Sequence, residues 1–395
     1  MMAVKNVEAH SFVIPRYTWA LGAIYQPWSD KGINHPSNSF YVITDENNVY
    51  VCLEDGKNSA GQTVTSTVKP TGTLTSAFET ADGYVWKFLY SVGALRASQF
   101  LSANFMPVTL FGAFDSSSPA DHVEQVGIQN AAVQGAITSY ELLSGGSGYT
   151  TIPTVSVVGN GTNAKAALTI SGGAVTKIDV KDSASTKAHG SGYSYAHIEI
   201  TGGGGSGAKA RAVLAPYNGF GADPRDDLKS TAIMFTAKPT GAEGSTWFTG
   251  NDFRQVMLIR NPEVPSSSTK FTASTGNALR RMKFASVTTN FTADKTIQGS
   301  SSLAKAYVVK RDSDEVWYIQ DSDTQFRAFI EGESITETDG SGAGVLDAAN
   351  VDADTNAFIL PDVDNVSGEV MFVDNRAAVS RSADQTEDVK IIIQL

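Results

Sequence analysis

The chain has 395 residues, of which 41% are hydrophobic and 18% charged, an ordinary balance for a globular protein. This length exceeds one usual compact domain, so we expect several domains. The net charge of −11 argues against nucleic acid or an anionic membrane as a main partner, because such binding draws on clustered lysines and arginines. Glycines punctuating runs rich in valine, threonine, isoleucine and tyrosine favour a mainly β, multidomain β-sandwich fold.

The distribution of charge and the single cysteine further restrict the class of protein. From Asp312 to the end the chain carries 19 acids and 4 bases, a net charge of −15, so the C-terminal half is acidic. The longest basic cluster, Arg280, Arg281 and Lys283, is interpreted as a solvated face. The single cysteine, Cys52, excludes an internal disulfide and is expected to be a half-buried strand residue. With no signal peptide and no run of about 18 apolar residues, we predict a soluble, unexported protein.

Residues 1–120 are predicted to form an N-terminal domain that is mixed α/β but dominated by strands. Residues 39–56 contain two alternating runs around a polar turn at Asp45–Asn48, which predicts a hairpin. A further strand is expected from the Asp82-Gly83 turn to Val92. Good helix formers over Ala94–Leu101 predict one short helix.

Residues 121–220 hold an internal duplication with an offset of 44 residues. Both copies place an alternating run between their end marks. We predict two similar β-units that bury their apolar faces against each other or a neighbour. The matched ends are "GSGY" at 146–149 and 190–193, and "AKA" at 164–166 and 208–210.

Residues 221–395 contain further alternating runs, whose spacing favours an acidic β-sandwich domain. The last run ends the chain, and we expect its strand, Ile391–Ile393, to be tied into a sheet. The runs lie at 255–260, 304–310, 315–320, 368–376 and 388–395.

The known motifs of catalytic and nucleotide-binding sites assign no residue of this sequence to such a site. Gly202–Gly207 formally fits the dinucleotide fingerprint, but the duplication predicts a strand after it, closed by Pro216, where that site needs a helix. The sequence contains no phosphate-binding P-loop, no nucleophile elbow and no H-E-x-x-H pair. His189 and His197 are interpreted as a surface turn and a strand edge. We therefore predict no catalytic, cofactor-binding or metal-binding residue.

Two acid-rich segments are candidate calcium sites. Asp352–Asn356 begins like an EF-hand loop but fails at Ala357 and Val363, where glycine and glutamate are required. Asp312–Thr324 is better explained as two acidic turns flanking a strand. A carboxylate pair for glycoside hydrolysis stays open, because its spacing is set by the fold, but no pair is singled out.

Aromatic residues gather in the first 90 positions, and they leave two interpretations. On β-domains such residues stack on sugar rings, so a carbohydrate-binding or carbohydrate-cleaving host-recognition protein is the alternative function. Packing in a core or subunit interface is the simpler account. The residues are Tyr17, Trp19, Tyr25, Trp28, Tyr41, Tyr50, Tyr84, Trp86 and Tyr90.

Five ordered segments span nearly the whole chain and resemble the baseplate wedge protein of T-even-like contractile-tailed phages (myoviruses), especially versions from phages of cyanobacteria. The "DGYVWKFLY" block and the C-terminal block are the more specific of them. The segments are "VIPRYTW" at 13–19, "NVYVCLEDG" at 48–56, "STVKPTGT" at 66–73, "FETADGYVWKFLYSV" at 78–92 and "SRSADQTEDVKIIIQL" at 380–395.

The resemblance implies a structural protein of the virion that is not an enzyme and needs no cofactor. Members form an elongated homodimer in each wedge around the tail hub and contact other wedge subunits, with no nucleic acid or membrane partner. They are mainly β, with a mixed N-terminal domain and two β-sandwiches, one inserted into the other. Assembly in the host cytoplasm follows. Relatives begin upstream of the point that Met1–Val7 resembles, so we expect the first domain to lack strands.

Overall fold

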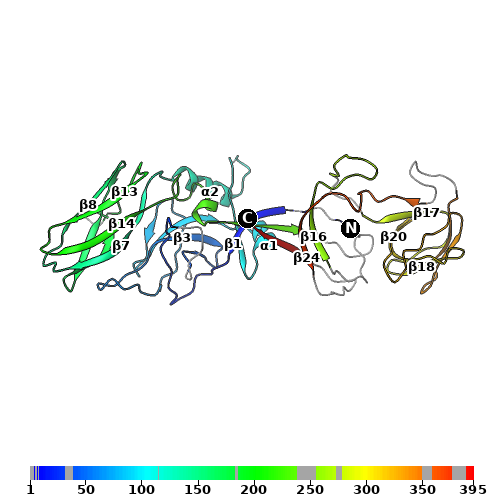
Figure 1. The fold of residues 1–395 in the computed structure, drawn as a ribbon, viewed down its shortest axis with the longest axis horizontal. Coiled ribbons are helices and arrows are strands. Elements are labelled where there is room, and N and C mark those ends of the chain that lie inside the picture. Colours follow the sequence, from blue (N-terminus) through cyan, green and yellow to red (C-terminus); the bar gives the residue numbers. More distant parts are fainter. Residues whose placement is uncertain are drawn as a thin grey trace. The chain divides into compact units, whose positions relative to one another are not determined.

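The computed structural model describes residues 4, 7, 9–31, 39–113, 115–182, 186–237, 255–272, 278–348, 358–375 and 388–395. The fold is mainly β and built from several antiparallel sheets, as predicted (Figure 1). The chain divides into two compact units. We call His10–Met234 with Ile392–Leu395 the N-terminal unit, and Phe235–Ile391 with Met1–Ala9 the C-terminal unit.

Strands from distant parts of the chain meet in a four-stranded sheet of order β25-β15-β1-β6. In β1 and β6, Phe12 lies opposite Val108 in antiparallel register. The amide of Leu395 donates to the carbonyl of Thr231 at 2.6 Å, so the last strand is tied into a sheet as predicted. The strands are β1 (Ala9–Pro15), β6 (Phe105–Val108), β15 (Ala232–Ala237) and β25 (Val389–Gln394).

A second sheet, of order β2-β3-β5-β4, forms the centre of the N-terminal unit. The predicted hairpin is confirmed: Tyr41 pairs with Val51, and Asn47 turns the chain with a φ of 62°. Both faces of the sheet are buried in hydrophobic clusters, which explains why β5 is apolar almost throughout. The strands are β2 (Tyr41–Ile43), β3 (Asn48–Glu54), β4 (Phe78–Glu79) and β5 (Val85–Ser91).

Among the described residues of the N-terminal unit, three segments are helical. The predicted short helix is confirmed as α1 (Ala94–Phe100). Helix α2 (Ala120–Asn130), which was not predicted from the sequence, packs against β5 and buries Gln125. The side chain of Gln125 accepts a hydrogen bond from the amide of Phe111 at 2.7 Å and donates to the carbonyl of Thr109. The third helix is α3 (Pro224–Asp227).

Residues 137–214 build a module with its own hydrophobic cluster. One sheet has the order β7-β14-β13-β8, and two further pairs are β10-β11 and β12-β9. The N-terminal unit thus contains two of the three predicted parts, while the boundaries at 120 and 220 stay predictions. The strands are β7 (Ile137–Ser147), β8 (Thr154–Gly159), β9 (Thr162–Ala164), β10 (Ala167–Ser171), β11 (Ala174–Asp179), β12 (His189–Ser191), β13 (Ala196–Thr201) and β14 (Ser206–Leu214).

The duplication predicted from the sequence is confirmed in the strand pairing of this module. The first copy's β7 pairs with the second copy's β14, and the second copy's β12 pairs with the first copy's β9. Residues at equivalent positions of these two pairings differ by 44 in residue number. The strands β8 and β13 pair directly with each other. The two copies therefore exchange strands around a local twofold relation. The matched pairs are Gly145–Ala208 with His189–Ala164, and Ser147–Ser206 with Ser191–Thr162.

Each copy also packs one buried tyrosine against a glycine of the other copy. Tyr149 and Tyr193 both lie in the module's core, with exposed fractions of 6% and 7%. The ring of Tyr149 covers Gly205 of the second copy, and the ring of Tyr193 covers Gly161 of the first. A side chain at either glycine would collide with the ring, so the two tyrosines occupy equivalent environments.

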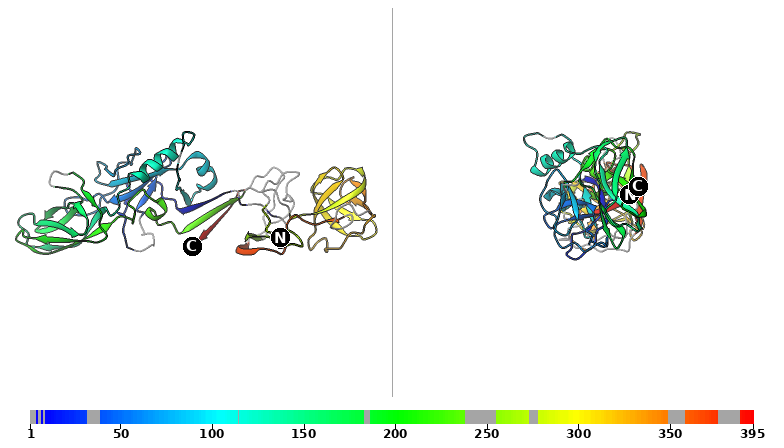
Figure 2. Two further views of the ribbon diagram at one scale, coloured as in Figure 1. Left: turned by 90° about the horizontal axis from the view of Figure 1, so that it is seen from above. Right: turned by 90° about the vertical axis from the view of Figure 1, so that its left-hand side faces the viewer.

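In the C-terminal unit the strand spacing had favoured a sandwich, but most strands close into a barrel. The sheet order is β20-β19-β18-β21-β22-β17, and β20 also pairs with β17 (Figure 2, yellow). β23 extends the sheet beside β17, and β16 pairs with β24 as a separate ribbon. The strands are β16 (Gln255–Arg260), β17 (Arg280–Thr289), β18 (Thr296–Gly299), β19 (Lys305–Asp312), β20 (Glu315–Ile319), β21 (Ser334–Glu337), β22 (Ala343–Leu346), β23 (Phe358–Ile359) and β24 (Glu369–Asn375).

A fully buried carboxyl group sits at the end of α3. Asp227 accepts a hydrogen bond from the amide of Gly221 at 2.7 Å through Oδ2, while its Oδ1 has no partner. Its main-chain oxygen accepts from Nε1 of Trp28 at 2.9 Å. Burial raises the pKa of Asp227 well above the usual range, and the hydrogen bond from Gly221 and the charge of Lys87 only partly oppose this. Burial therefore favours the neutral form of the carboxyl group.

Replacing Asp227 with asparagine should make the stability of the protein less dependent on pH. Because the folded-state pKa is raised, the neutral acid's contribution is complete below its unfolded pKa of about 3.9 and is lost as pH rises through the folded pKa. Asp227→Asn stays neutral and keeps an acceptor for Gly221. Urea unfolding at several pH values above 4 should show a smaller loss of stability with pH in the variant. Parallel pH curves would contradict this account.

The strand exchange predicts matched effects of two substitutions. Gly161→Ala and Gly205→Ala should each destabilise the protein by about 1–3 kcal/mol, because each new methyl group meets a tyrosine ring and backbone atoms. Gly127→Ala in α2 is the control: its methyl group meets nothing, so it should stabilise the helix by about 1 kcal/mol. Urea midpoints measure all three. If only one of the two module glycines is sensitive, the copies are not equivalent.

Candidate functional site

Three of the segments that carry the family resemblance meet around Asp82. Nε1 of Trp19 donates to the hydroxyl of Ser66 at 3.2 Å, and that hydroxyl donates to Oδ2 of Asp82 at 3.1 Å. The same carboxylate oxygen accepts from the amides of Thr67 and Val68 at 2.7 and 2.9 Å. Segments 13–19, 66–73 and 78–92 are thus joined through one carboxylate, which we call the Asp82 clip.

The clip requires an ionised acid. Burial raises the pKa of Asp82, but hydrogen bonds from the Thr80 hydroxyl and the amides of Val68 and Thr67 outweigh this and lower it overall. The charge is used to satisfy backbone donors in a loop, and it is not directed at a pocket.

The clustered aromatic residues of the first 90 positions pack in the core. Trp86, Tyr41, Tyr50, Tyr84 and Tyr90 are fully buried, and Tyr25 and Trp28 nearly so. Buried hydroxyls donate to main-chain carbonyls, for example Tyr84 to Val64 and Tyr50 to Gly72, both at 2.7 Å. Tyr17 and Trp19 are half-buried. Of the two interpretations, packing therefore describes the buried members of this set.

The structure also shows where the other candidate residues from the sequence lie. Residues 202–205 of the glycine run form the turn between β13 and β14, and Ser206 and Gly207 begin β14, so a strand follows the glycines, as predicted. His189 is partly buried, with Nδ1 2.8 Å from the carbonyl oxygen of Ile137, whereas His197 is exposed near Glu199. Cys52 is fully buried in β3, and burial raises the pKa of its thiol well above its usual range.

Of the two acid-rich segments, the structure describes only Asp312–Thr324. Asp312–Thr324 contains the end of β19, the strand β20 and a turn in which Asp321 accepts from the amides of Asp323 and Thr324. This matches two acidic turns flanking a strand. Asp352–Asn356 lies outside the described residues. Among the residues that the structure does describe, no three His, Cys, Asp or Glu side chains are grouped as a metal site.

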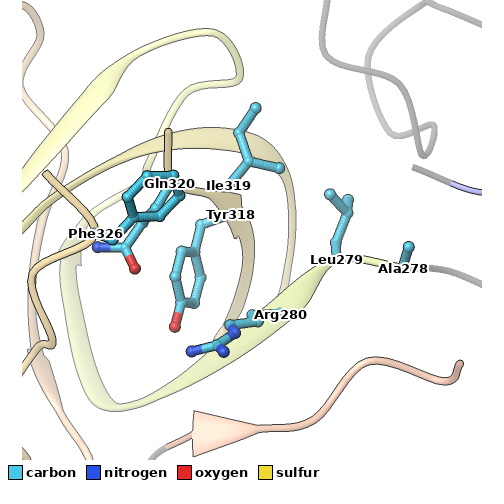
Figure 3. A pocket seen from close by; sticks show the side chains of 7 residues that line it. All are labelled: Ala278, Leu279, Arg280, Tyr318, Ile319, Gln320 and Phe326. Atoms are coloured by element: carbon cyan, nitrogen blue, oxygen red, sulfur yellow. The ribbon is translucent and has the colours of Figure 1, made fainter. Parts of the chain in front are cut away.

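A pocket with a volume of about 220 Å³ lies beside β17 and β20 (Figure 3). Of the residues that line it, Leu279 and Ile319 are buried with Val309 on the strand face opposite Tyr318, and Phe326 is exposed. The remaining lining residues are Ala278, Arg280, Tyr318 and Gln320. We call this the barrel-mouth pocket.

Strand register places an arginine in this pocket. Arg280 lies opposite Tyr318 in the β17–β20 pair, on the same strand face as buried Met282, while Arg281 and Lys283 point to the other face. The three basic residues were predicted to form one solvated face; Arg280 is exposed, whereas Arg281 and Lys283 are half-buried on the other face. Burial raises the pKa of the Tyr318 hydroxyl, and the nearby Arg280 guanidinium partly opposes that shift.

In comparisons with known proteins, no family model, curated protein or solved structure matches the chain. Within the described part of the chain, no helix is both long and apolar enough to cross a membrane.

The Asp82 clip predicts a large effect of removing this hydrogen-bonded acid and a small effect of removing an exposed one. Asp82→Ala should destabilise the protein by about 3 kcal/mol, because the amides of Thr67 and Val68 lose their acceptor. Asp45→Ala removes an exposed ion pair with Lys69 and should cost less than about 1 kcal/mol. Urea unfolding at pH 7 compares the two variants. Equal effects would show that the clip does not hold the loop.

Proposed function

We propose that this chain is a structural subunit of the baseplate wedge of a contractile-tailed phage, linking neighbouring wedge proteins around the tail hub. The observation that carries the proposal is the place of the resembling segments in the fold. Segments 48–56 and 78–92 supply β3, β4 and β5 of the central sheet, and segment 380–395 ends in β25. The resemblance thus covers the residues on which the N-terminal unit is built.

The use of polar side chains supports a structural role over a catalytic one. Asp82 holds a loop, His189 contacts a main-chain carbonyl oxygen, and Cys52 is buried and kept protonated. Groups used in this way are poor nucleophiles and bases, because they are either satisfied or shielded from a substrate. We infer that the protein is not an enzyme, needs no cofactor, and works as a component of the virion assembled in the host cytoplasm.

The charge distribution supports specific partners. We propose that the chain forms a homodimer and that its acidic C-terminal half, net −15 from Asp312 onward, meets basic surfaces of other wedge subunits. Opposite charges speed the encounter and select the orientation of partners. Isolated surface ion pairs contribute only about 0–1 kcal/mol, so apolar contacts must hold the finished complex.

Assembly kinetics test this proposal. The purified chain should sediment as a dimer at micromolar concentration, and added salt should slow its association with other wedge subunits more than it speeds their dissociation. Stopped-flow light scattering and dilution experiments measure the two rates separately. A strictly monomeric chain, or association rates that do not depend on salt, would contradict the proposal. Turnover of host polysaccharide would instead favour a host-recognition enzyme.

A further inference from the structure

Three large apolar side chains are exposed together at one end of the barrel. Leu303, Phe326 and Ile330 have exposed fractions of 54%, 66% and 52%, and we call them the barrel-tip patch. We propose that this patch binds the same patch of a second copy of the chain. The inference rests on the homodimer proposed above, and it assigns the face through which that dimer forms.

Strand pairing brings the residues of the patch to the same end of the barrel. Leu303 lies in the turn between β18 and β19, and the other two residues lie in the loop between β20 and β21. Because β19 pairs antiparallel with β20, and β18 with β21, this turn and this loop leave the barrel at the same end. The Nε2 atom of Gln320 joins them, since it donates to the carbonyls of Lys305 at 2.9 Å and Arg327 at 2.6 Å.

A buried carboxylate holds the turn and the loop in place. Glu333 accepts from the amides of Ser301 and Ser302, both at 2.9 Å, through Oε2, and from the amide of Ile330 at 2.7 Å through Oε1. The guanidinium of Arg327 also donates to the carbonyl of Ser302 at 3.3 Å. The patch is therefore presented by segments that are already fixed in the free chain, which lowers the entropic cost of binding a partner.

The backbone is strained at two members of the patch. Leu303 and Phe326 have φ angles of 56° and 48°, and Gln325 has a φ of 61°. This left-handed conformation costs energy in residues with large side chains, and such strain clusters at functional sites. Burial within the chain does not offset the cost, because both apolar side chains are exposed. A partner that covers the patch would supply the missing burial.

The charges around the patch fit a second copy of the chain better than a basic partner. The turn, the loop and the first residue of β17 carry equal numbers of exposed or half-buried cations and acids, although the chain from Asp312 onward has a net charge of −15. In a twofold contact a surface meets itself, so it must offer charges of both signs. The cations are Arg280, Lys305 and Arg327, and the acids are Asp321, Asp323 and Glu331.

Sedimentation velocity of the full chain over a concentration series tests the assigned face. Leu303→Asp and Phe326→Asp should each raise the dimer dissociation constant at least about tenfold, because a charge enters the apolar centre of the contact. Leu95→Asp makes the same change at a leucine of α1 that is 72% exposed, and it should leave the constant unchanged. Aspartate adopts a left-handed φ more readily than leucine or phenylalanine, so both tip variants should fold, which urea unfolding checks.

The possible results separate this inference from the proposed function. A wild-type chain that is monomeric at micromolar concentration would contradict both this inference and the proposed homodimer. Dimers that survive both tip substitutions would overturn the assigned face alone. Equal weakening by Leu95→Asp would show that the effect does not come from the tip. Tip variants that dimerise normally but fail to join assembled tails would assign the patch to another wedge subunit and also overturn the inference.

Discussion

Buried and half-buried carboxylates that accept hydrogen bonds from backbone amides hold loops of this strand-rich protein. Asp82, Glu333 and Glu337 each accept from at least two main-chain N–H groups. A loop that lies against a core cannot leave its amides unpaired, since each unsatisfied donor costs about 1–3 kcal/mol. Without these acids, the amides that donate to them would lose their partners within the fold.

The same constraint explains why an acid-rich chain offers so few candidates for chemistry. Hydrogen bonds outweigh the effect of burial and lower the pKa values of Asp82 and Glu333, so both are ionised near neutral pH and already satisfied. Catalytic acids need the opposite: a carboxyl group with a raised pKa that faces a cleft. Asp227 has a raised pKa, but it is fully buried within the core. Its environment is that of a structural residue.

Local patterns in the sequence predicted local elements well. Alternation predicted the β2–β3 hairpin and β25, and good helix formers predicted α1. Helix α2 was missed because Gly127 and few apolar residues weaken its periodicity. Closure of the barrel depends on pairing between β17 and β20, which alternation along each strand cannot reveal. The barrel-mouth pocket was missed for the same reason, because strand register brings Arg280 beside Tyr318. The 44-residue offset revealed the duplication but not the exchange of strands between its copies.

A low-resolution reconstruction of the assembled tail, with this chain carrying a small fused marker, is the most direct test of a structural role in the baseplate. The account predicts marker density within the baseplate body, repeated in every wedge and present as two copies in each. Density at a fibre tip, or a marker absent from assembled tails, would contradict it.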